Sequence, residues 1–351
     1  MTGRSLARRR RRTVLGALVL VVLGVVVGGI VWFDGQVSPG PAGPAVMVTV
    51  ADGASVSSVT ADLAREEVVG SSLAFRIYLI LHGTPIVRSG LYRMHRNQGF
   101  ASVRAALAAG PNVFAVTVLP GTTVAEVASA VGKEAPGHRR SAFLAEARSG
   151  REQSPYQPPG SGNLEGLLGP GSYLVVPGES DGQLLGQMIG RFSRGADALG
   201  LSAAAAAQGL TPYEAITAAS IVQKEAISPG DSDQATRHNA GPVARVIYNR
   251  LARGMPLQMD ATVLYAEGRD GGTVTPADLA LATPYNTYLH TGLTPTPICF
   301  PSALALEAAL HPPAGSWLYF ELTSRDGTET FSDTFAEQVT AEQLARHRGL
   351  P

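Results

Sequence analysis

The stretch TPYEAITAASIVQKEA, residues 211–226, predicts a helix with a clear start. Thr211 suits the N-cap, Pro212 suits the first helical position, and Glu214 stands at the spacing of a capping box. The rest of the stretch follows a helical period, with Thr217, Ser220, Gln223 and Lys224 on one side and Ala215, Ala218, Ala219, Val222 and Ala226 on the other. The second side is apolar, so we expect it to face a core.

Glu225 falls at the border of this apolar side. A carboxylate held against apolar atoms loses hydration, which raises its pKa and lets it act as a general acid near neutral pH. A glutamate at such a border could equally reach into solvent, or pair with an arginine such as Arg245. The helical period alone leaves these interpretations open.

The segments around this helix predict an α+β fold. Further helices are expected over residues 181–199 and 242–253, and a hairpin from residues 317–322 and 328–331. Residues 153–163 contain QSPYQPPGSG, whose Pro, Gly and Ser content is typical of a linker. The sequence therefore predicts a C-terminal domain over residues 164–351.

An uncharged apolar segment, residues 13–33, predicts a transmembrane helix, because it is long enough to cross about 30 Å of hydrocarbon. The tail that precedes it, residues 1–12, carries Arg4 and the run Arg8 to Arg12. Such a basic flank stays in the cytoplasm, so the rest of the chain is expected outside a single-pass cytoplasmic-membrane anchor. A cleaved signal peptide is the alternative, although its apolar core is usually shorter. Residues 34–45, rich in Pro and Gly, are expected to form a linker.

Residues 46–152 contain a partial internal repeat. VTVADGASVSSVTADL, residues 48–63, is echoed by VTVLPGTTVAEVASAV, residues 116–131. Each copy reads as a strand, a turn and a helix, which predicts a pair of small βα units.

Composition excludes several classes of function. The formal net charge is zero, and the basic residues of the tail balance a more acidic remainder without a basic patch, so we expect no nucleic-acid partner. Cys299 is the one cysteine, which rules out an intramolecular disulfide. The seven histidines lack metal-ligand spacing, so we expect neither a metal nor another cofactor.

Several short motifs follow Glu225 in a fixed order. They are SIVQKE (220–225), IYNRL (247–251), GMPLQMDAT (254–262), TPYNTY (283–288), GLTP (292–295), AALHP (308–312), WLYF (317–320) and FSDT (331–334). In this order the chain closely resembles the endolytic murein transglycosylases of the YceG-like family. The resemblance extends more weakly to Leu164-Glu-Gly166, and residues 46–152 are similar to the family's LysM-like region.

The resemblance implies an activity. Enzymes of this family cleave the β-1,4 bond between N-acetylmuramic acid and N-acetylglucosamine within a peptidoglycan strand, without water as nucleophile. Glu225 matches their catalytic glutamate, and the new ends carry 1,6-anhydromuramic acid. Cleavage of nascent strands would end their elongation, so glycan strands are the expected substrate, the membrane holds the enzyme, and peptidoglycan synthases are candidate partners.

Four residues of the matching motifs are candidates for binding sugars: Gln258, Asp260, Tyr285 and Asn286. Each has a structural alternative, since Asn286 could cap a loop and Asp260 could cap a helix over residues 261–266. The chain departs from the family pattern in the polar insertion at residues 227–241, at Leu174 and at Gln338, which stand where a carboxylate and a histidine are common. Two other functions compete: a catalytically weak peptidoglycan-binding or scaffold protein, and a metal-dependent periplasmic hydrolase.

Overall fold

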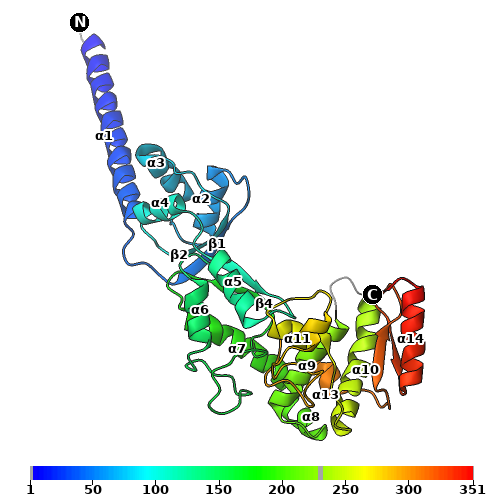
Figure 1. Ribbon diagram of the computed structural model, residues 1–351. Coiled ribbons are helices and arrows are strands. Elements are labelled where there is room, and N and C mark those ends of the chain that lie inside the picture. Colours follow the sequence, from blue (N-terminus) through cyan, green and yellow to red (C-terminus); the bar gives the residue numbers. More distant parts are fainter. Residues whose placement is uncertain (1–2, 228–231, 351) are drawn as a thin grey trace. The chain divides into compact units, whose positions relative to one another are not determined.

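The computed structural model describes residues 3–227 and 232–350, and the chain forms two compact units (Figure 1). Unit 1 comprises the residues up to Phe114 together with 176–178, and unit 2 comprises residues 115–175 and those from Glu179 onward. Residues 1–2 of the predicted basic tail and residues 228–231 of the predicted insertion lie outside the described residues.

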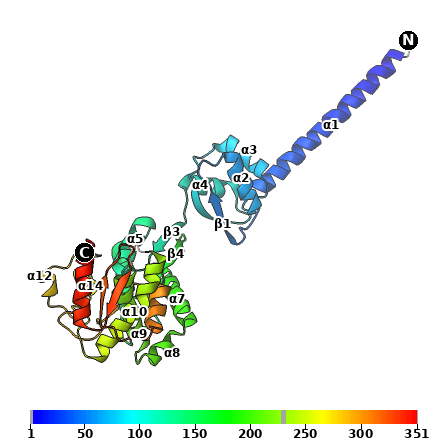
Figure 2. The ribbon, with the colours of Figure 1, turned by 90° about the vertical axis from the view of Figure 1, so that its right-hand side faces the viewer.

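Unit 1 is built on a two-stranded sheet with helices beside it. Its elements are α1 (Gly3–Val37), β1 (Ala45–Val50), α2 (Val56–Arg65), α3 (Ser72–His82), β2 (Gly90–His95) and α4 (Phe100–Ala109). Strands β1 and β2 pair antiparallel. Val48 and Val50 alternate inward along β1 and pack with Leu63 and Phe75 from the helices, whereas Thr49 faces out. Figure 2 shows α2, α3 and α4 gathered beside β1 and the end of α1.

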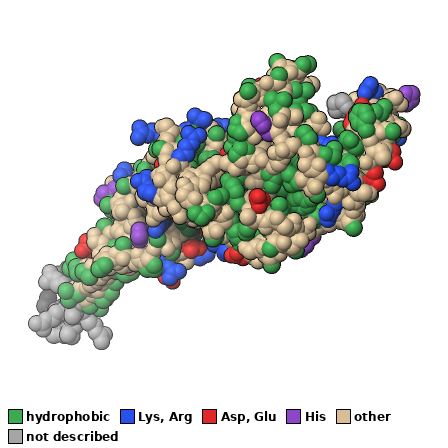
Figure 3. Space-filling model, turned by 60° about the horizontal axis from the view of Figure 1, so that its bottom comes forward, with side chains coloured by type: hydrophobic (Ala, Val, Ile, Leu, Met, Phe, Trp, Pro, Cys, Tyr) green, Lys and Arg blue, Asp and Glu red, His purple; other side chains and the backbone are tan. Residues whose placement is uncertain are grey.

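The long helix α1 contains the predicted transmembrane segment and extends beyond it. Residues 14–37 form a helical stretch long and apolar enough to cross a bilayer, with Asp34 as its one charged residue, and the rest of the protein buries none of its most apolar part. In the space-filling view, hydrophobic side chains gather along this helix (Figure 3). Near its end, Phe33 and Val37 pack against the core of unit 1, so the helix and the unit form a continuous body.

Unit 2 begins with the second copy of the repeat. Its elements are β3 (Phe114–Val118), α5 (Val124–Glu134), α6 (Arg140–Ala147) and β4 (Gly171–Val175), and β3 pairs with β4. Each copy of the repeat thus opens a strand-helix-helix-strand sequence with its own two-stranded sheet. Residues 115–152, which the sequence groups with the first copy, pack in unit 2.

The segment expected to be a linker, residues 153–163, is also packed in unit 2. The ring of Tyr156 meets that of Phe192 edge to face at 6.3 Å, and its hydroxyl donates a hydrogen bond to Asp197. Ser154 is buried. Pro and Gly here shape an ordered loop on the surface of α7.

The remaining helices of unit 2 surround α9. They are α7 (Asp181–Ala198), α8 (Leu201–Ala207), α9 (Pro212–Ala226), α10 (Asp233–Ala252), α11 (Asp260–Ala266), α12 (Pro276–Leu279), α13 (Ala303–Leu310) and α14 (Phe335–His347). The predicted capping box of α9 is present, with Thr211 and Glu214 each accepting from the other's backbone N–H. Helices α8, α10, α11 and α13 contact α9 on several sides. Residues 215–223 are therefore all buried, including the polar Thr217, Ser220 and Gln223.

The C-terminal part adds the predicted hairpin. Strands β5 (Tyr319–Leu322) and β6 (Glu329–Ser332) pair antiparallel and pack with α14. Helix α10 starts at Asp233, nine residues before the start at Pro242 that the sequence predicts. Much of the polar insertion is therefore helical. Its buried Asn239 donates to Gly327 O at 2.7 Å and accepts from Glu329 N, which fixes the insertion to the hairpin.

Candidate functional site

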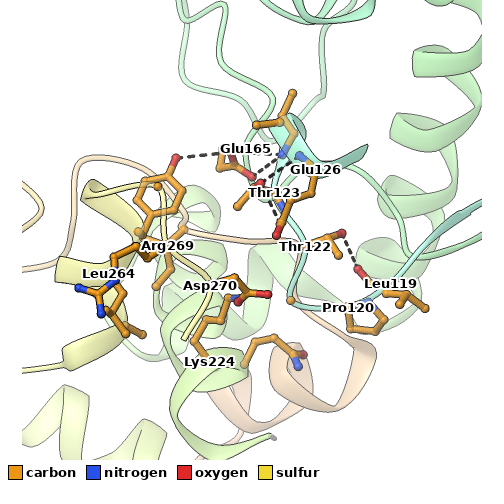
Figure 4. A pocket seen from close by; sticks show the side chains of 18 of the residues that line it. Leu119, Pro120, Thr122, Thr123, Glu126, Glu165, Lys224, Leu264, Arg269 and Asp270 are labelled. Atoms are coloured by element: carbon orange, nitrogen blue, oxygen red, sulfur yellow. Dashed lines mark hydrogen bonds and ion pairs between the residues drawn. The ribbon is translucent and has the colours of Figure 1, made fainter. Parts of the chain in front are cut away.

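A pocket of about 1350 Å³ lies in unit 2 among the end of α9, the start of α5, the loop before β4, and α11. Three of its carboxylates stand on different elements: Glu225 at the end of α9, Glu165 in the loop before β4, and Asp260 at the start of α11. Figure 4 shows Glu165, Thr123 and Glu126 close together, and Lys224 beside Asp270 elsewhere in the wall. The pocket is large enough for a sugar chain segment.

Glu225 is half-buried at the C-terminal end of α9 and lines this pocket. Loss of hydration raises the pKa of its carboxyl to about 7, and the negative charge of Asp260 acts in the same direction. Opposing them, the N–H of Ala261 at the start of α11 donates to Glu225 Oε1 at 3.1 Å. A carboxyl group with this pKa is partly protonated at neutral pH, so it can both give and take a proton.

The pairing of Glu225 with an arginine such as Arg245, left open by the sequence, does not describe this geometry. Arg245 donates from Nε to the carbonyl of Pro313 at 2.7 Å and so binds the loop that follows α13. The cation next to Glu225 in sequence, Lys224, pairs with Asp270 at 2.6 Å. In the part of the chain that the structure describes, Glu225 therefore has no ion pair to hold it ionised.

Glu165 is a second pocket carboxylate, which the sequence did not single out as a site residue. It is buried, and burial raises its pKa to about 7 against the hydrogen bond that it accepts from Val124 N at 3.1 Å. The hydroxyl of Tyr265 on α11 donates to its other oxygen at 3.4 Å. Helix α11 thus touches both carboxylates, Glu225 through Ala261 and Glu165 through Tyr265. The Leu164-Glu-Gly166 motif was the signal that could have found it.

Asp260 and Gln258, both predicted to bind sugars, differ in position. Asp260 is exposed, lines the pocket, and accepts from the hydroxyl of Tyr288 at 2.6 Å. Gln258 is exposed but is not among the residues that line the pocket. Its backbone takes a positive φ of 52° and its N–H donates to Thr287 O, which turns the chain into α11.

Tyr285 and Asn286 lie behind the pocket wall. Tyr285 is half-buried, its ring stands 5.2 Å from that of Tyr265, and its hydroxyl meets Thr296 Oγ1 at 2.9 Å. Asn286 is completely buried, and its amide donates to the carbonyls of Leu279 and Leu281 at 2.9 Å each. The amide group of Asn286 is therefore used to fold the loop, as in the loop-capping alternative, and its contact with a sugar stays a prediction.

Residues 298–302 fix two walls of the pocket together. Ile298 N donates to Ser220 Oγ at 3.0 Å, and Ser302 N donates to Gln223 Oε1 at 2.8 Å, so both ends of the segment bind α9. Between them, Phe300 exchanges two backbone hydrogen bonds of 2.8 Å with the loop that leads into α5, residues 119–123. These bonds also explain how Ser220 and Gln223 can be buried on α9, because each side chain keeps a hydrogen-bond partner.

Of the positions where the chain departs from the family pattern, Leu174 and Gln338 do not line the pocket, whereas part of the insertion does. Leu174 is exposed on β4 and does not line the pocket, and Gln338 is buried on α14, where it donates to Glu321 Oε2 at 3.1 Å. Ile227, the first residue of the insertion, lines the pocket beside Glu225. Among the described residues, no three His, Cys, Asp or Glu side chains gather in an arrangement that could hold a metal ion.

Comparison with known proteins gives four consistent findings. A family model described as the YceG-like family matches residues 48–343. The chain is 29% identical to an endolytic murein transglycosylase of Bacillus subtilis over 85% of this chain and 84% of that protein. It is 26% identical to one of Streptococcus pneumoniae over 80% of this chain and 55% of that protein, so it spans little more than half of that relative. A solved YceG-like protein of Listeria monocytogenes has a similar fold, with a TM-score of 0.57 and 23% identity over 84% of this chain and 98% of that one.

Proposed function

Because the chain belongs to the YceG-like family, we propose that it is a membrane-anchored endolytic lytic transglycosylase of peptidoglycan. Its substrate would be the nascent glycan strand, cleaved at the β-1,4 bond between N-acetylmuramic acid and N-acetylglucosamine. The relatives from Bacillus subtilis and Streptococcus pneumoniae, both named endolytic murein transglycosylase, support this activity. Cleavage within a strand would end its elongation.

The observation that carries the proposal is the state of Glu225. Its carboxyl lines a pocket of about 1350 Å³, and its pKa of about 7 leaves it partly protonated at neutral pH. An ordinary glutamate would be almost fully ionised there and could not donate a proton. Glu225 Oε1 accepts the Ala261 N–H, and Oε2 forms no hydrogen bond with a described residue, so Oε2 is the oxygen placed to carry the reacting proton.

The reaction balances with Glu225 as its single acid and base. Protonated Glu225 gives its proton to the glycosidic oxygen as the bond from that oxygen to C1 of the muramic residue breaks. The resulting carboxylate takes the proton of the muramic C6 hydroxyl, whose oxygen forms a new bond to C1 and closes the 1,6-anhydro ring. Water is not consumed, and Glu225 is protonated again for the next cycle. Because the nucleophile belongs to the substrate, no second carboxylate is needed to activate water.

We assign Glu165 a positioning role in this scheme. It is buried and both of its oxygens are bonded, one to the start of α5 and the other to Tyr265 of α11. Helix α11 also supplies the N–H that binds Glu225. Glu165 therefore holds the helix that orients the acid, whereas Asp260, exposed in the pocket, is the better candidate among the predicted residues for a direct contact with a sugar.

The proposed location follows from α1. Residues 14–37 satisfy the length and composition of a membrane span, and the arginines of residues 4–12 favour an N-terminus in the cytoplasm. Both compact units would then lie outside the cytoplasmic membrane, where nascent glycan is found. Peptidoglycan synthases are proposed partners because they would supply that glycan.

The test is to incubate the purified full-length protein in detergent with uncrosslinked glycan strands and to identify the new ends by mass spectrometry. We expect 1,6-anhydromuramic ends from the unchanged protein and none from Glu225→Gln. Glu214→Gln is the matched control, because it makes the same chemical change on the same helix at an exposed capping residue. That variant should keep its activity.

Other outcomes would decide against the proposal. Anhydro ends that persist in Glu225→Gln would remove Glu225 from the chemistry. Reducing ends formed with uptake of water would indicate a hydrolase. Glycan that binds without being cut by the unchanged protein would favour the peptidoglycan-binding or scaffold function.

A further inference from the structure

Helix α3 in unit 1 has two apolar sides, although only one of them packs in the core. Phe75, Tyr78 and Leu79 are buried, and the Phe75 ring meets that of Phe100 on α4 at 5.1 Å. The opposite side is exposed and is here called the α3 apolar face, formed by Leu73, Ile77, Ile80 and Leu81. Ile80 is 78% exposed, and Ile86 in the loop that follows is 86% exposed. Contiguous exposed apolar surfaces of this kind are typical of sites that bind a protein, a ligand or a membrane.

The position of α3 beside α1 indicates what covers this face. Helix α1 packs against α3, and both Figure 1 and Figure 2 show α3 next to the end of α1. The candidate membrane span of α1, 24 residues from Val14 to Val37, is about 36 Å long as a helix, whereas the hydrocarbon core is about 30 Å thick, and the polar residues Asp34 and Gln36 fall in its last turn. The last turn, with Phe33 and Val37 packed on unit 1, can therefore lie at the membrane surface. Helix α3 would then lie at the same level.

The charge of this part of unit 1 suits the surface of an anionic membrane. From Val68 to Phe114 the sequence contains no Asp or Glu, but it contains five arginines. Two of them, Arg76 on α3 and Arg88 after Ile86, are exposed, and neither forms an ion pair with a described carboxylate. Exposed apolar side chains flanked by cations are typical of helices that lie in the interface of a bilayer with anionic lipids.

We propose that the α3 apolar face, together with Ile86, inserts into the interfacial layer of the bilayer that α1 spans, with Arg76 and Arg88 on anionic headgroups. Unit 1 is thereby held against the membrane at two points, the anchor and α3. The inference rests on the membrane-anchor part of the proposed function and is independent of the catalytic part.

The test uses the full-length protein in nanodiscs that contain phosphatidylglycerol. An environment-sensitive fluorophore is attached at Ile80→Cys, and Cys299 stays unlabelled because it is buried. The matched control is Thr49→Cys, on the outward side of β1 in the same unit. Nitroxide lipids that quench near the headgroups should remove roughly half of the emission at position 80, because interfacial helices sit about 5–10 Å deep. Emission at position 49 should not change.

The outcomes separate this inference from the anchor itself. A protein that fails to stay with the nanodiscs during gel filtration refutes the anchor and the α3 proposal with it. A protein that stays with the discs, but whose label at position 80 is quenched no more than the label at position 49, overturns the α3 proposal alone. Crosslinking of two copies through position 80 without lipid quenching would assign the face to a second copy instead. A label at Ile86→Cys repeats the measurement if the first variant does not fold.

Discussion

The rate of glycan cleavage should fall as the pH rises through about 7, since Glu225 must be protonated to begin the reaction. With that pKa, the protonated fraction drops from about nine tenths at pH 6 to about one tenth at pH 8, a loss of roughly tenfold. A glutamate with its ordinary pKa would lose about a hundredfold over the same interval, from a far lower starting rate. The shape of the alkaline side of the profile therefore reports the burial of this carboxyl.

The substitution Asp260→Asn tests one cause of the raised pKa of Glu225. The charge of Asp260 adds to the raised pKa of Glu225, so the neutral amide should lower that pKa and move the alkaline side of the profile to lower pH. Each half unit of movement lowers the rate on that side by about threefold. The asparagine can still accept the hydrogen bond of Tyr288, so the loop should keep its place.

The assay is the initial rate of formation of 1,6-anhydromuramic ends between pH 5.5 and 8.5, measured by mass spectrometry at saturating glycan. Glu165→Gln serves as the control, because Glu165 also has a pKa of about 7 and could produce the same profile. We expect this variant to keep the decline near pH 7 at a lower overall rate. If the decline disappears in Glu165→Gln, or if Asp260→Asn moves it to higher pH, the assignment of the titrating acid to Glu225 is wrong.

Three further predictions concern stability, each measured by chemical denaturation. Glu165 and Glu225 both have a pKa raised to about 7 in the folded state, so the unchanged protein should lose stability between pH 4.5 and about 7, because these groups ionise first in the unfolded chain. Glu165→Gln should lack the part of this loss that Glu165 causes, keep the part that Glu225 causes, and gain up to about 3 kcal/mol over the unchanged protein at pH 8. Asn286→Ala should cost about 2–4 kcal/mol, because it removes two hydrogen bonds from the buried amide to the carbonyls of Leu279 and Leu281, of which, among the described residues, only Leu281 O keeps another donor, Thr283 N. Ser220→Ala should cost about 1–3 kcal/mol by leaving the buried N–H of Ile298 unpaired, and an unchanged stability would show that the 298–302 segment does not depend on this bond.

Local signals in the sequence predicted local structure well. The capping box of Thr211 and Glu214 predicted the start of α9, and the strand-like residues 317–322 and 328–331 predicted the hairpin β5–β6. Glu225 was placed at the border of an apolar side, and the structure shows why its pKa rises. These features depend on residues within a few positions of each other, so their pattern is visible in the chain.

Features that depend on distant residues were missed. Ser220 and Gln223 looked like an outward polar side, but their partners are the N–H groups of residues 298 and 302, far along the chain. Glu165 lies in a loop without periodicity, and its partner Tyr265 is a hundred residues away. Asn286 was expected to bind sugar because of its motif, although a motif does not reveal whether a side chain points into a pocket or into the loop that carries it.

The four hydrogen bonds described above for the 298–302 segment bear on how tightly the pocket can hold its substrate. Because they join α9, which carries Glu225, to the loop before α5, the acid and the opposite wall are ordered when the protein folds. The conformational entropy of that arrangement is thus lost before any glycan arrives, and binding need not supply it. Amide hydrogens of residues 298, 300 and 302 should consequently exchange with solvent at nearly the same rate in the free and the glycan-bound protein, so that any tightening on binding falls on the pocket's other elements.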